Sequence, residues 1–426
     1  MNSLLRIPYA VAGRVADAFT AVVPAGDSKF RRGLSARRGL IERYRTWGNT
    51  NRDSARPLVW FHAPSVGEGL QALPVIELVR QRRRDVQIAY TFYSPSAERF
   101  AQSVQADFRD YLPFDRFDHA EAMISALRPT ALIFSKLDIW PALTESAAAS
   151  GIGVGVVSAT LPESSARRGV LARALLADAY RAIDKVGAID EADAERLREQ
   201  GVQRDRITVT GDTRYDQVWL RARKPSPPLV ESLRSSRPTL VAGSTWPSDE
   251  EHLLPAWPRI RDKIPDARLI IAPHEIDSRH LDSIIKWARS NDLRLARIDS
   301  PDATGAEVLL IDRFGILGDL YALADVAYVG GAFHSAGLHS VLEPAAFGAP
   351  VLFGPRYQKS RDAAKLLAAA GGAVVNGEVD LAIRLGDWLG SVSARDAAGA
   401  AARAMVQEGL GAAERSYQLV TTLLPR

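Results

Sequence analysis

Short runs of apolar, β-branched and aromatic residues recur along the first half of this chain, separated by longer segments of helix-like sequence. Such runs predict buried strands, and strands that alternate with helices predict a parallel sheet covered by helices. The six runs are residues 58–61, 86–92, 131–134, 154–157, 186–189 and 207–210. The first half is therefore predicted to be an α/β domain with a doubly wound sheet.

The same alternation restarts after a stretch rich in Pro and Ser, which predicts an interdomain linker. The runs of the second half are residues 239–242, 269–272, 308–311, 326–329, 350–353 and 373–375. A chain of 426 residues, 46% of them hydrophobic, is long enough for two such domains. We expect two Rossmann-like halves that face each other across a cleft.

The domain boundaries follow from these two sets of strands and from the composition of the chain ends. We expect an N-terminal amphipathic and basic segment, an N-terminal Rossmann-like domain, a linker, a second Rossmann-like domain and an Ala-rich C-terminal helix. Their predicted bounds are residues 1–45, 46–223, 224–238, 239–400 and 401–426, respectively.

An apolar stripe at helical spacing runs along the first two dozen residues, with Arg6 and Asp17 opposite it. The stripe consists of Leu4, Val11, Val15, Phe19 and Val22. The charges interrupt any uniformly apolar span, so we do not expect a transmembrane helix. An amphipathic helix of this kind either lies on a membrane surface or packs its stripe against its own protein.

The basic run that follows favours the membrane over self-packing, because each Lys or Arg near an anionic leaflet contributes roughly 1 kcal/mol. Its members are Lys29, Arg31, Arg32, Arg37, Arg38, Arg43 and Arg45. The chain contains no cysteine, which excludes disulfides and thiolate metal sites and permits a cytoplasmic location. It also has no GxxxxGK[ST] phosphate loop, and we expect no nucleic-acid partner.

Residues just after each strand are the candidates for chemistry, because ligands of open α/β sheets bind beyond the carboxyl ends of the strands. After the first strand, the sequence HAPSVGEG brings Glu68 to the start of a helix. Gly67 and Gly69 would leave room for a substrate hydroxyl to approach Glu68, as a general base requires. The alternative is that Glu68 only complements the positive end of the helix.

A Gly-Gly pair follows the predicted strand at residues 326–329, and Gly337 is expected to precede a helix that carries His339, Ser340 and Glu343. Backbone N–H groups at such a helix start suit a phosphate. Glu343, one turn further on, could accept hydrogen bonds from ribose hydroxyls. We interpret this segment as a nucleotide-binding site; the alternative is a turn that serves only packing.

Gly243, Ser244 and Thr245 lie between the first strand of the second half and an acidic helical turn. Their small hydroxyl side chains could bind a phosphate or a sugar carboxylate. Equally, they could cap the helix, with Asp249 and Glu250 opposing its dipole. His62 and His274 could each be a ligand or a hydrogen-bonded structural histidine, and neither has metal-ligand spacing.

Taken in order along nearly the whole chain, these segments resemble the 3-deoxy-D-manno-octulosonic acid (Kdo) transferases. The resemblance rests on the N-terminal basic run and on the motifs HAPSVGE, LDIWP, VTGDTRYD, AGSTWPSDE, IIAPHE, IDRFGILGDLYALADVAYVGG and GLHSVLEPAAFGAPVLFGP. The Lys136 version of the tryptophan motif, the PHE motif and the GGAF sequence look most like the Bacteroidetes-type form.

The resemblance implies a GT-B fold and metal-independent, inverting transfer of Kdo from CMP-Kdo to a lipid A precursor such as lipid IVA, without a cofactor. This step of lipopolysaccharide core biosynthesis would take place at the anionic cytoplasmic face of a bacterial inner membrane. Glu68 would be the general base, and Asp138 would organise the acceptor side. The acceptor-binding residues would be Ser65, Gly67 and Lys136. The donor-binding residues would be Arg214, Gly243, Ser244, Thr245, His274, Gly337, His339, Ser340 and Glu343.

The chain departs from the family pattern at several of these positions. Lys136 reverses the charge of the usual Glu, and Asp138 also replaces a Glu. Ser340, Arg214 and Thr160 stand where Asn, Lys and Arg are common. Two other functions fit the same architecture, a UDP-sugar 2-epimerase and a non-catalytic sugar-nucleotide-binding protein. The epimerase would not need an amphipathic membrane segment or the basic run beside it, and the binding protein is suggested by the departures at Lys136, Thr160 and Ser340.

Overall fold

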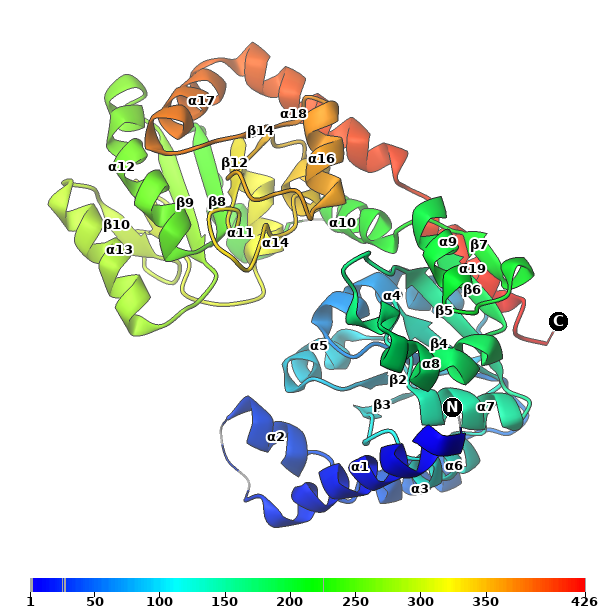
Figure 1. Cartoon of the computed structure of the whole chain (residues 1–426). Coiled ribbons are helices and arrows are strands. Elements are labelled where there is room, and N and C mark those ends of the chain that lie inside the picture. Colours follow the sequence, from blue (N-terminus) through cyan, green and yellow to red (C-terminus); the bar gives the residue numbers. More distant parts are fainter. Residues whose placement is uncertain (1–2, 25, 27, 225, 426) are drawn as a thin grey trace. The chain divides into compact units, whose positions relative to one another are not determined.

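The chain forms two seven-stranded parallel sheets, each packed against helices (Figure 1). The computed structural model describes residues 3–24, 26, 28–224 and 226–425. Unit 1 comprises Met1–Gln217 and Leu410–Arg426, and unit 2 comprises Val218–Gly409. All twelve predicted strands are present. Together with the similarity reported below, this architecture confirms the predicted fold class of two Rossmann-like domains of the GT-B type.

The sheet of unit 1 has the strand order β3-β2-β1-β4-β5-β6-β7. Its strands are β1 Leu58–His62, β2 Gln87–Phe92, β3 Phe108–Tyr111, β4 Ala131–Ser135, β5 Gly153–Ala159, β6 Lys185–Ala188 and β7 Ile207–Val209. β1 lies in the interior of the sheet, between β2 and β4, and each of its residues is buried. The strand order changes direction between β1 and β4, which makes their carboxyl ends the topological switch point of this sheet, the usual place for a ligand.

The helices of unit 1 include one from the far end of the chain. They are α1 Ser3–Val22, α2 Lys29–Ser35, α3 Leu40–Thr50, α4 Val66–Arg82, α5 Glu98–Ser103, α6 Phe117–Leu127, α7 Pro141–Ala149, α8 Val170–Ala182, α9 Glu191–Glu199 and α19 Ala412–Thr421. α19 packs on α4, where Arg82 Nη1 lies 2.7 Å from Glu414 Oε1. Asp216 accepts hydrogen bonds from the backbone N–H groups of Gly411 and Ala413, both at 2.9 Å.

The sheet of unit 2 has the order β10-β11-β9-β8-β12-β13-β14, and its switch point lies between β8 and β12. Its strands are β8 Thr239–Thr245, β9 Arg268–Pro273, β10 Leu295–Arg297, β11 Val308–Leu310, β12 Val326–Val329, β13 Val351–Phe353 and β14 Gly372–Val374. The helices are α11 Pro228–Ser232, α12 Pro247–Lys263, α13 Ser278–Ser290, α14 Leu317–Leu320, α15 Leu342–Phe347, α16 Arg361–Ala368, α17 Glu378–Gly390 and α18 Val392–Glu408.

The chain passes between the units twice, once within α10 Thr213–Arg223 and once after α18. The segment predicted to be a linker, residues 224–238, contains α11, because Val230 and Leu233 are buried in the core of unit 2. The predicted single C-terminal helix is divided between α18 and α19 around Gly411, whose φ of 90° favours glycine.

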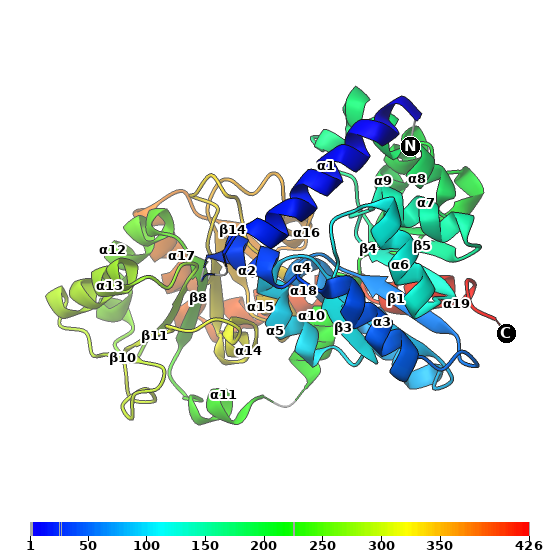
Figure 2. The ribbon, with the colours of Figure 1, turned by 90° about the horizontal axis from the view of Figure 1, so that it is seen from below.

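The polar side of α1 faces unit 1. Tyr9 Oη donates to Asp115 Oδ2 at 2.6 Å, Arg116 Nη1 lies 2.8 Å from Asp17 Oδ2, and the Arg6 guanidinium carbon lies 4.1 Å from the ring centroid of Phe117. Figures 1 and 2 both place the N-terminal end of α1 beside α7 and α8. The helix is therefore attached to its own domain through its charged and hydroxyl groups.

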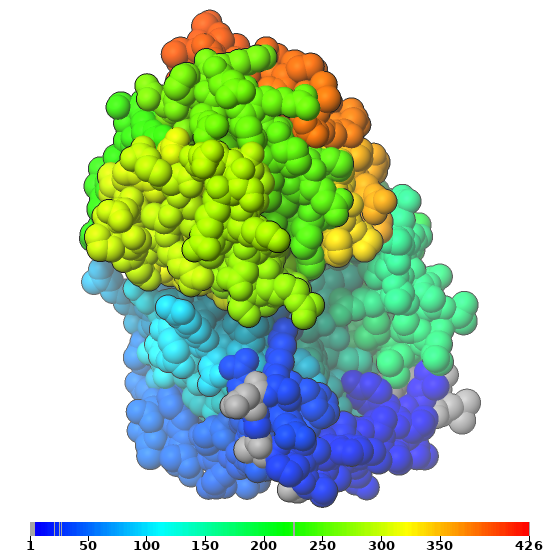
Figure 3. All heavy atoms as spheres, turned by 90° about the vertical axis from the view of Figure 1, so that its left-hand side faces the viewer, coloured from blue at the N-terminus to red at the C-terminus, as the bar shows by residue number. Residues whose placement is uncertain are grey.

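The apolar stripe of α1 points away from the domain. Val11, Val15 and Phe19 are each 53% exposed, and Val22 is 78% exposed, whereas the side chain of Leu4 lies outside the described part of the chain. In Figure 3 the atoms of α1 and α2, in blue, lie at the surface. Self-packing of this stripe, one of the two predicted alternatives, is wrong. Within the described residues, no helix is long and apolar enough to cross a membrane.

Only some residues of the basic run face the solvent. Arg37 is buried and donates to the carbonyl oxygens of Leu112, Gly33 and Tyr93. Arg43 pairs with Asp110 at 2.7 Å. Arg37 is therefore not available to an anionic surface, because its guanidinium satisfies buried carbonyl groups. Lys29, Arg31 and Arg32 on α2 are exposed.

Candidate active site

Glu68 lies in the first turn of α4, directly after β1, at the switch point of unit 1. Its carboxylate accepts a short hydrogen bond from the Ser65 hydroxyl, and its Oε1 lies 3.2 Å from Lys136 Nζ at the end of β4. The Ser135 hydroxyl donates to the backbone carbonyl of Glu68 at 2.7 Å. Three of the predicted acceptor-side residues are thus brought together by two neighbouring strands.

The environment of Glu68 favours its ionised form. Burial by itself would raise the pKa of Glu68, but the Ser65 hydroxyl and the Lys136 ammonium group hold this pKa below its ordinary value. The Glu68 side chain is 17% exposed, so it remains accessible from one side. At neutral pH the carboxylate is unprotonated, which is the state that a general base requires.

The two glycines that flank Glu68 have different roles. Gly67 is exposed, and a Cβ atom there would meet only the Ser65 hydroxyl, at 3.8 Å. A Cβ atom at Gly69 would lie 2.4 Å from the ring of Phe100 and 2.7 Å from Tyr90 Oη. The prediction that Gly69 gives room to a substrate is therefore wrong, because this glycine allows α4 to pack closely on the protein core.

Asp138 follows β4 and is held by two side chains. Arg167 Nη2 lies 2.7 Å from Asp138 Oδ1, and Trp140 Nε1 donates to Asp138 Oδ2 at 3.0 Å. Arg167 also donates to the backbone carbonyl of Leu137. Arg167 is absent from the predicted site because it lies in a three-residue 3-10 helix, Ala166–Arg168, between β5 and α8, where neither periodicity nor motif spacing indicates a partner. Thr160, in the same loop, donates to Asp193 at 3.3 Å.

His62 and Arg214 have partners within unit 1. His62 is buried, with Nδ1 3.0 Å from the Thr91 hydroxyl, and burial lowers its pKa to about 4. It is therefore a neutral structural histidine. Arg214 makes a two-pronged contact with Asp212, with its Nε at 2.9 Å and its Nη2 at 2.6 Å from Oδ2. Arg214 belongs to unit 1, whereas the other predicted donor-binding residues belong to unit 2.

At the switch point of unit 2, the loop after β12 folds back onto the end of β8. A Cβ atom at Gly330 would lie 2.3 Å from the carbonyl oxygen of Ser244, and Gly331 has a φ of 98°. Only glycine permits this close approach and this backbone conformation. The buried Asp249 carboxylate joins the segments by accepting hydrogen bonds from the backbone N–H groups of Trp246 and Gly331 and from the Tyr328 hydroxyl.

Thr245 and Glu250 form a buried polar network with His280. The Thr245 hydroxyl donates to Glu250 Oε1 at 2.7 Å, and His280 Nε2 lies 2.9 Å from Glu250 Oε2. The hydrogen bond to Glu250 raises the pKa of His280. Thr245 is fully buried, and its carbonyl accepts a hydrogen bond from the His274 backbone N–H at 2.8 Å, so its hydroxyl serves this internal network. Ser244, next to it, is half-buried and has a φ of 54°.

The helix expected directly after Gly337 begins later. α15 starts at Leu342, so His339 and Ser340 lie in the preceding loop and only Glu343 is helical. The loop is closed by a hydrogen bond from the His339 backbone N–H to the Gly330 carbonyl at 3.1 Å. The predicted helix start is wrong because this bond and the φ of 93° at Gly337 keep the backbone out of the helical conformation.

Glu343 lies beside a cation that sequence reasoning missed. Arg221 Nη1 is 3.3 Å from Glu343 Oε1, and Arg221 Nε is 3.3 Å from Asp319 Oδ1. Burial raises the pKa of Glu343, while Arg221 opposes this shift and Asp319 adds to it. Arg221 lies at the end of α10, where a basic residue is common for helix-dipole reasons, so the sequence contains no signal of its link to Glu343.

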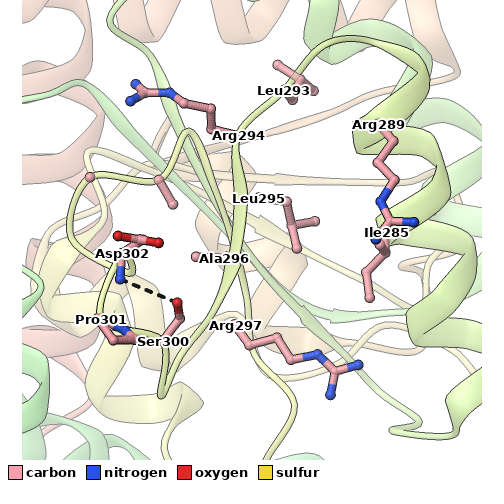
Figure 4. Close-up of a pocket in the computed structure, with 12 residues that line it drawn as sticks. Ile285, Arg289, Leu293, Arg294, Leu295, Ala296, Arg297, Ser300, Pro301 and Asp302 are labelled. Atoms are coloured by element: carbon pink, nitrogen blue, oxygen red, sulfur yellow. Dashed lines mark hydrogen bonds between the residues drawn. The ribbon is translucent and has the colours of Figure 1, made fainter.

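Figure 4 shows a surface pocket of unit 2 beside the edge strand β10. Arg289, Arg294 and Arg297 line it, together with the apolar side chains of Ile285 and Leu295. None of the predicted site residues lies in this pocket. Among the described residues, no group of three or more His, Asp or Glu side chains could hold a metal ion.

Comparison with solved structures gives the fold. Over 86% of this chain and 99% of the other, the structure is similar to UDP-GlcNAc 2-epimerase from Neisseria meningitidis, with a TM-score of 0.61 and 13% sequence identity. At this level of identity, the similarity concerns the fold alone.

Sequence comparison finds similarity to one named group of transferases. Residues 33–217 match the family model of 3-deoxy-D-manno-octulosonic-acid transferase (kdotransferase). The chain is 27% identical to 3-deoxy-D-manno-octulosonic acid transferase of Haemophilus influenzae, over 92% of each protein. It is 28% identical to the protein of the same name from Bordetella pertussis, over 84% of this chain and 85% of that one. Residues 33–217 therefore match the 3-deoxy-D-manno-octulosonic-acid transferase model, and the chain is similar over most of its length to proteins of that name.

Proposed function

We propose that this protein transfers Kdo from CMP-Kdo to a lipid A precursor of the lipid IVA type, a step in lipopolysaccharide core biosynthesis. The observation that carries the proposal is the ionised, accessible Glu68 carboxylate at the switch point of unit 1, within the residues that match the Kdo transferase model. A carboxylate at the carboxyl end of a parallel sheet is suitably placed to act on a bound ligand.

Glu68 is the proposed general base. It would take the proton from the acceptor hydroxyl as the hydroxyl oxygen attacks the anomeric carbon of Kdo, while the bond from that carbon to the phosphate oxygen breaks and CMP leaves. The Ser65 hydroxyl orients the carboxylate. Lys136 would bind a negatively charged group of the acceptor, and Asp138, held by Arg167 and Trp140, would position it.

Unit 2 is the proposed donor-binding domain. The backbone of residues 243–245 and of the loop around Gly337 would hold the phosphate, with His274, His339 and Ser340 as hydrogen-bonding side chains. Glu343 would accept hydrogen bonds from the ribose, and Arg221 supports this role by keeping a charged partner beside the carboxylate. Arg214 would contribute a positive charge from unit 1.

The proposed function is tested by incubating the purified protein with CMP-Kdo and lipid IVA and weighing the lipid by mass spectrometry. We expect a product heavier by one or more Kdo residues. An unchanged acceptor mass would indicate a binding protein instead. Calorimetric titration that detects binding of a UDP-sugar and no response to CMP would favour the epimerase alternative.

Replacing Lys136 by Met should shift the acid limb of the kcat/KM profile to higher pH. The ammonium group stabilises ionised Glu68, so its loss raises the pKa of Glu68, and the base becomes protonated at a higher pH than in the native protein. The measurement is kcat/KM between about pH 4 and 8. Lys136→Arg keeps the charge and should leave the acid limb in place; an equal shift in both variants would contradict the assignment.

We also propose that the protein acts at the cytoplasmic face of the bacterial inner membrane, held there by α1 and α2. Among the described residues, the large hydrophobic side chains exposed by unit 1 are confined to α1, α2 and the first turn of α8. They are Ile7, Val11, Val15, Phe19, Val22, Phe30, Val170 and Leu171. Such a concentration of exposed apolar surface is typical of an interaction site. The exposed Lys29, Arg31 and Arg32 would contact anionic lipid headgroups.

Replacing Val11 and Val15 together by Asp should lower the partition of the protein into anionic vesicles at least about tenfold, because burying one Val side chain contributes about 1.5 kcal/mol. Flotation of vesicles at low and high salt measures this, and salt should weaken the remaining association by screening the basic residues. The matched control is Val379→Asp with Ile383→Asp, two residues of similar exposure and the same spacing on α17. Equal flotation of both double variants would refute the membrane role of α1.

A further inference from the structure

Four rings meet at the carboxyl ends of the central strands of unit 2. Trp246, between β8 and α12, stacks on His274 at a centroid distance of 4.5 Å and on His334 at 4.1 Å, with an interplanar angle of only 6° in the second pair. The ring centroids of His274 and His339 are 4.5 Å apart. His274 follows β9, and the other two histidines lie in the loop after β12. The cluster thus connects three strand ends.

Within this cluster, Trp246 Nε1 lies 3.3 Å from His339 Nε2. The indole nitrogen can only donate, so Nε2 must be the unprotonated nitrogen of the imidazole. In a neutral histidine the proton is then on Nδ1. Among the described residues no group accepts a hydrogen bond from His339 Nδ1. This nitrogen is also absent from the buried atoms that lack a partner, so it is partly exposed and its N–H can reach a ligand.

Trp246 is held at its backbone as well as at its ring. Its backbone N–H donates to Asp249 Oδ2 at 2.9 Å, and the same oxygen accepts from the Gly331 backbone N–H at 2.8 Å. The ring has little freedom, because two histidine rings stack on it. A side chain fixed in this way can orient a neighbour to which it donates a hydrogen bond.

We propose that Trp246 is a positioning residue of the donor site, which holds His339 as the neutral tautomer with its Nδ1–H presented to an anionic oxygen of the donor. The inference rests on the proposed function, because the donor of a Kdo transferase carries a phosphate and a carboxylate. Two titratable groups face His339. His274 disfavours a positive charge on His339, and Asp249 favours one. Burial and His274 lower the pKa of His339, in agreement with a neutral ring.

Nitrogen-15 NMR of histidine-labelled full-length protein tests the tautomer directly. In the native protein, we expect the His339 signals of an unprotonated Nε2 and a protonated Nδ1. Trp246→Phe keeps a stacked ring but removes the donor, so His339 should become a mixture of tautomers and its pKa should rise, because the lost bond favoured the neutral form. The KM for CMP-Kdo should rise about 2- to 10-fold, the usual worth of one hydrogen bond, with kcat nearly unchanged.

Trp287→Phe, at a half-buried tryptophan of α13 in the same unit, is the matched control and should change neither the tautomer nor the KM. In a double-mutant cycle, Trp246→Phe should add no further loss to His339→Ala. Protonated Nε2 in the native protein, or an unchanged tautomer and pKa in Trp246→Phe, would overturn the proposal. If CMP-Kdo is not a substrate, native turnover is absent, whereas the NMR result still decides the role of Trp246.

Discussion

Replacing Glu68 by Gln should lower the rate of Kdo transfer by about 10²- to 10⁴-fold, the range that a general base contributes. Gln has nearly the same size and can still accept a hydrogen bond from Ser65, but an amide cannot take the proton of the acceptor hydroxyl. Glu68 lies in the first turn of α4, and Gln is nearly isosteric with Glu, so the substitution removes one charge with little change in packing.

The measurement is kcat with saturating CMP-Kdo and lipid acceptor, together with calorimetric titration of CMP. We expect CMP affinity to stay close to that of the native protein, since all predicted donor-binding residues except Arg214 belong to unit 2. Glu77→Gln, two to three turns further along α4, is the matched control and should keep native turnover. Undiminished transfer by Glu68→Gln would exclude this residue as the base.

Replacing Asp249 by Ala should destabilise unit 2 by about 3 to 5 kcal/mol. The side chain is fully buried and accepts hydrogen bonds from the Trp246 and Gly331 backbone N–H groups and the Tyr328 hydroxyl. Each buried donor that loses its acceptor costs about 1 to 3 kcal/mol. Since the three donors connect the start of α12 with β12 and the loop after it, the whole switch point should loosen.

Amide hydrogen exchange in β8 and β12 reports the opening free energy of unit 2 separately from that of unit 1. We expect faster exchange in both strands of Asp249→Ala and unchanged exchange in β1 and β4. Asp262→Ala, at an exposed position of the same helix, should have little effect. Similar exchange in the two variants would show that the buried carboxylate is not a major contributor to stability.

The interior strands could be predicted from the sequence, but two edge strands could not. β3 has the sequence FRDY, and β10 is the three-residue sequence LAR. An edge strand packs fewer of its side chains and tolerates charge, so its sequence lacks the apolar run on which prediction depends. The twelve predicted strands, in contrast, are mostly central and buried, and the composition of such strands is restricted by the core on both faces.

The candidate site was predictable in position but not in its contacts. Glu68 and Lys136 each follow a strand, and in a parallel sheet the carboxyl ends of all strands lie on the same side, so both residues are expected there. That the two side chains form an ion pair depends on β1 and β4 being neighbours, although 68 residues separate the pair in sequence. The same reason explains why the sequence did not indicate Arg167 beside Asp138 or Trp246 beside His339.

The N-terminal helix α1 has some features that the sequence determines and others that only the tertiary structure determines. The sequence by itself determined that α1 is a helix with one apolar and one polar side, because side-chain spacing along a helix is a local property. Only the tertiary structure decided which side faces outward. Tyr9 and Asp17 find their partners in Asp115 and Arg116, more than 95 residues away, and these contacts attach the polar side to the domain and leave the apolar side exposed.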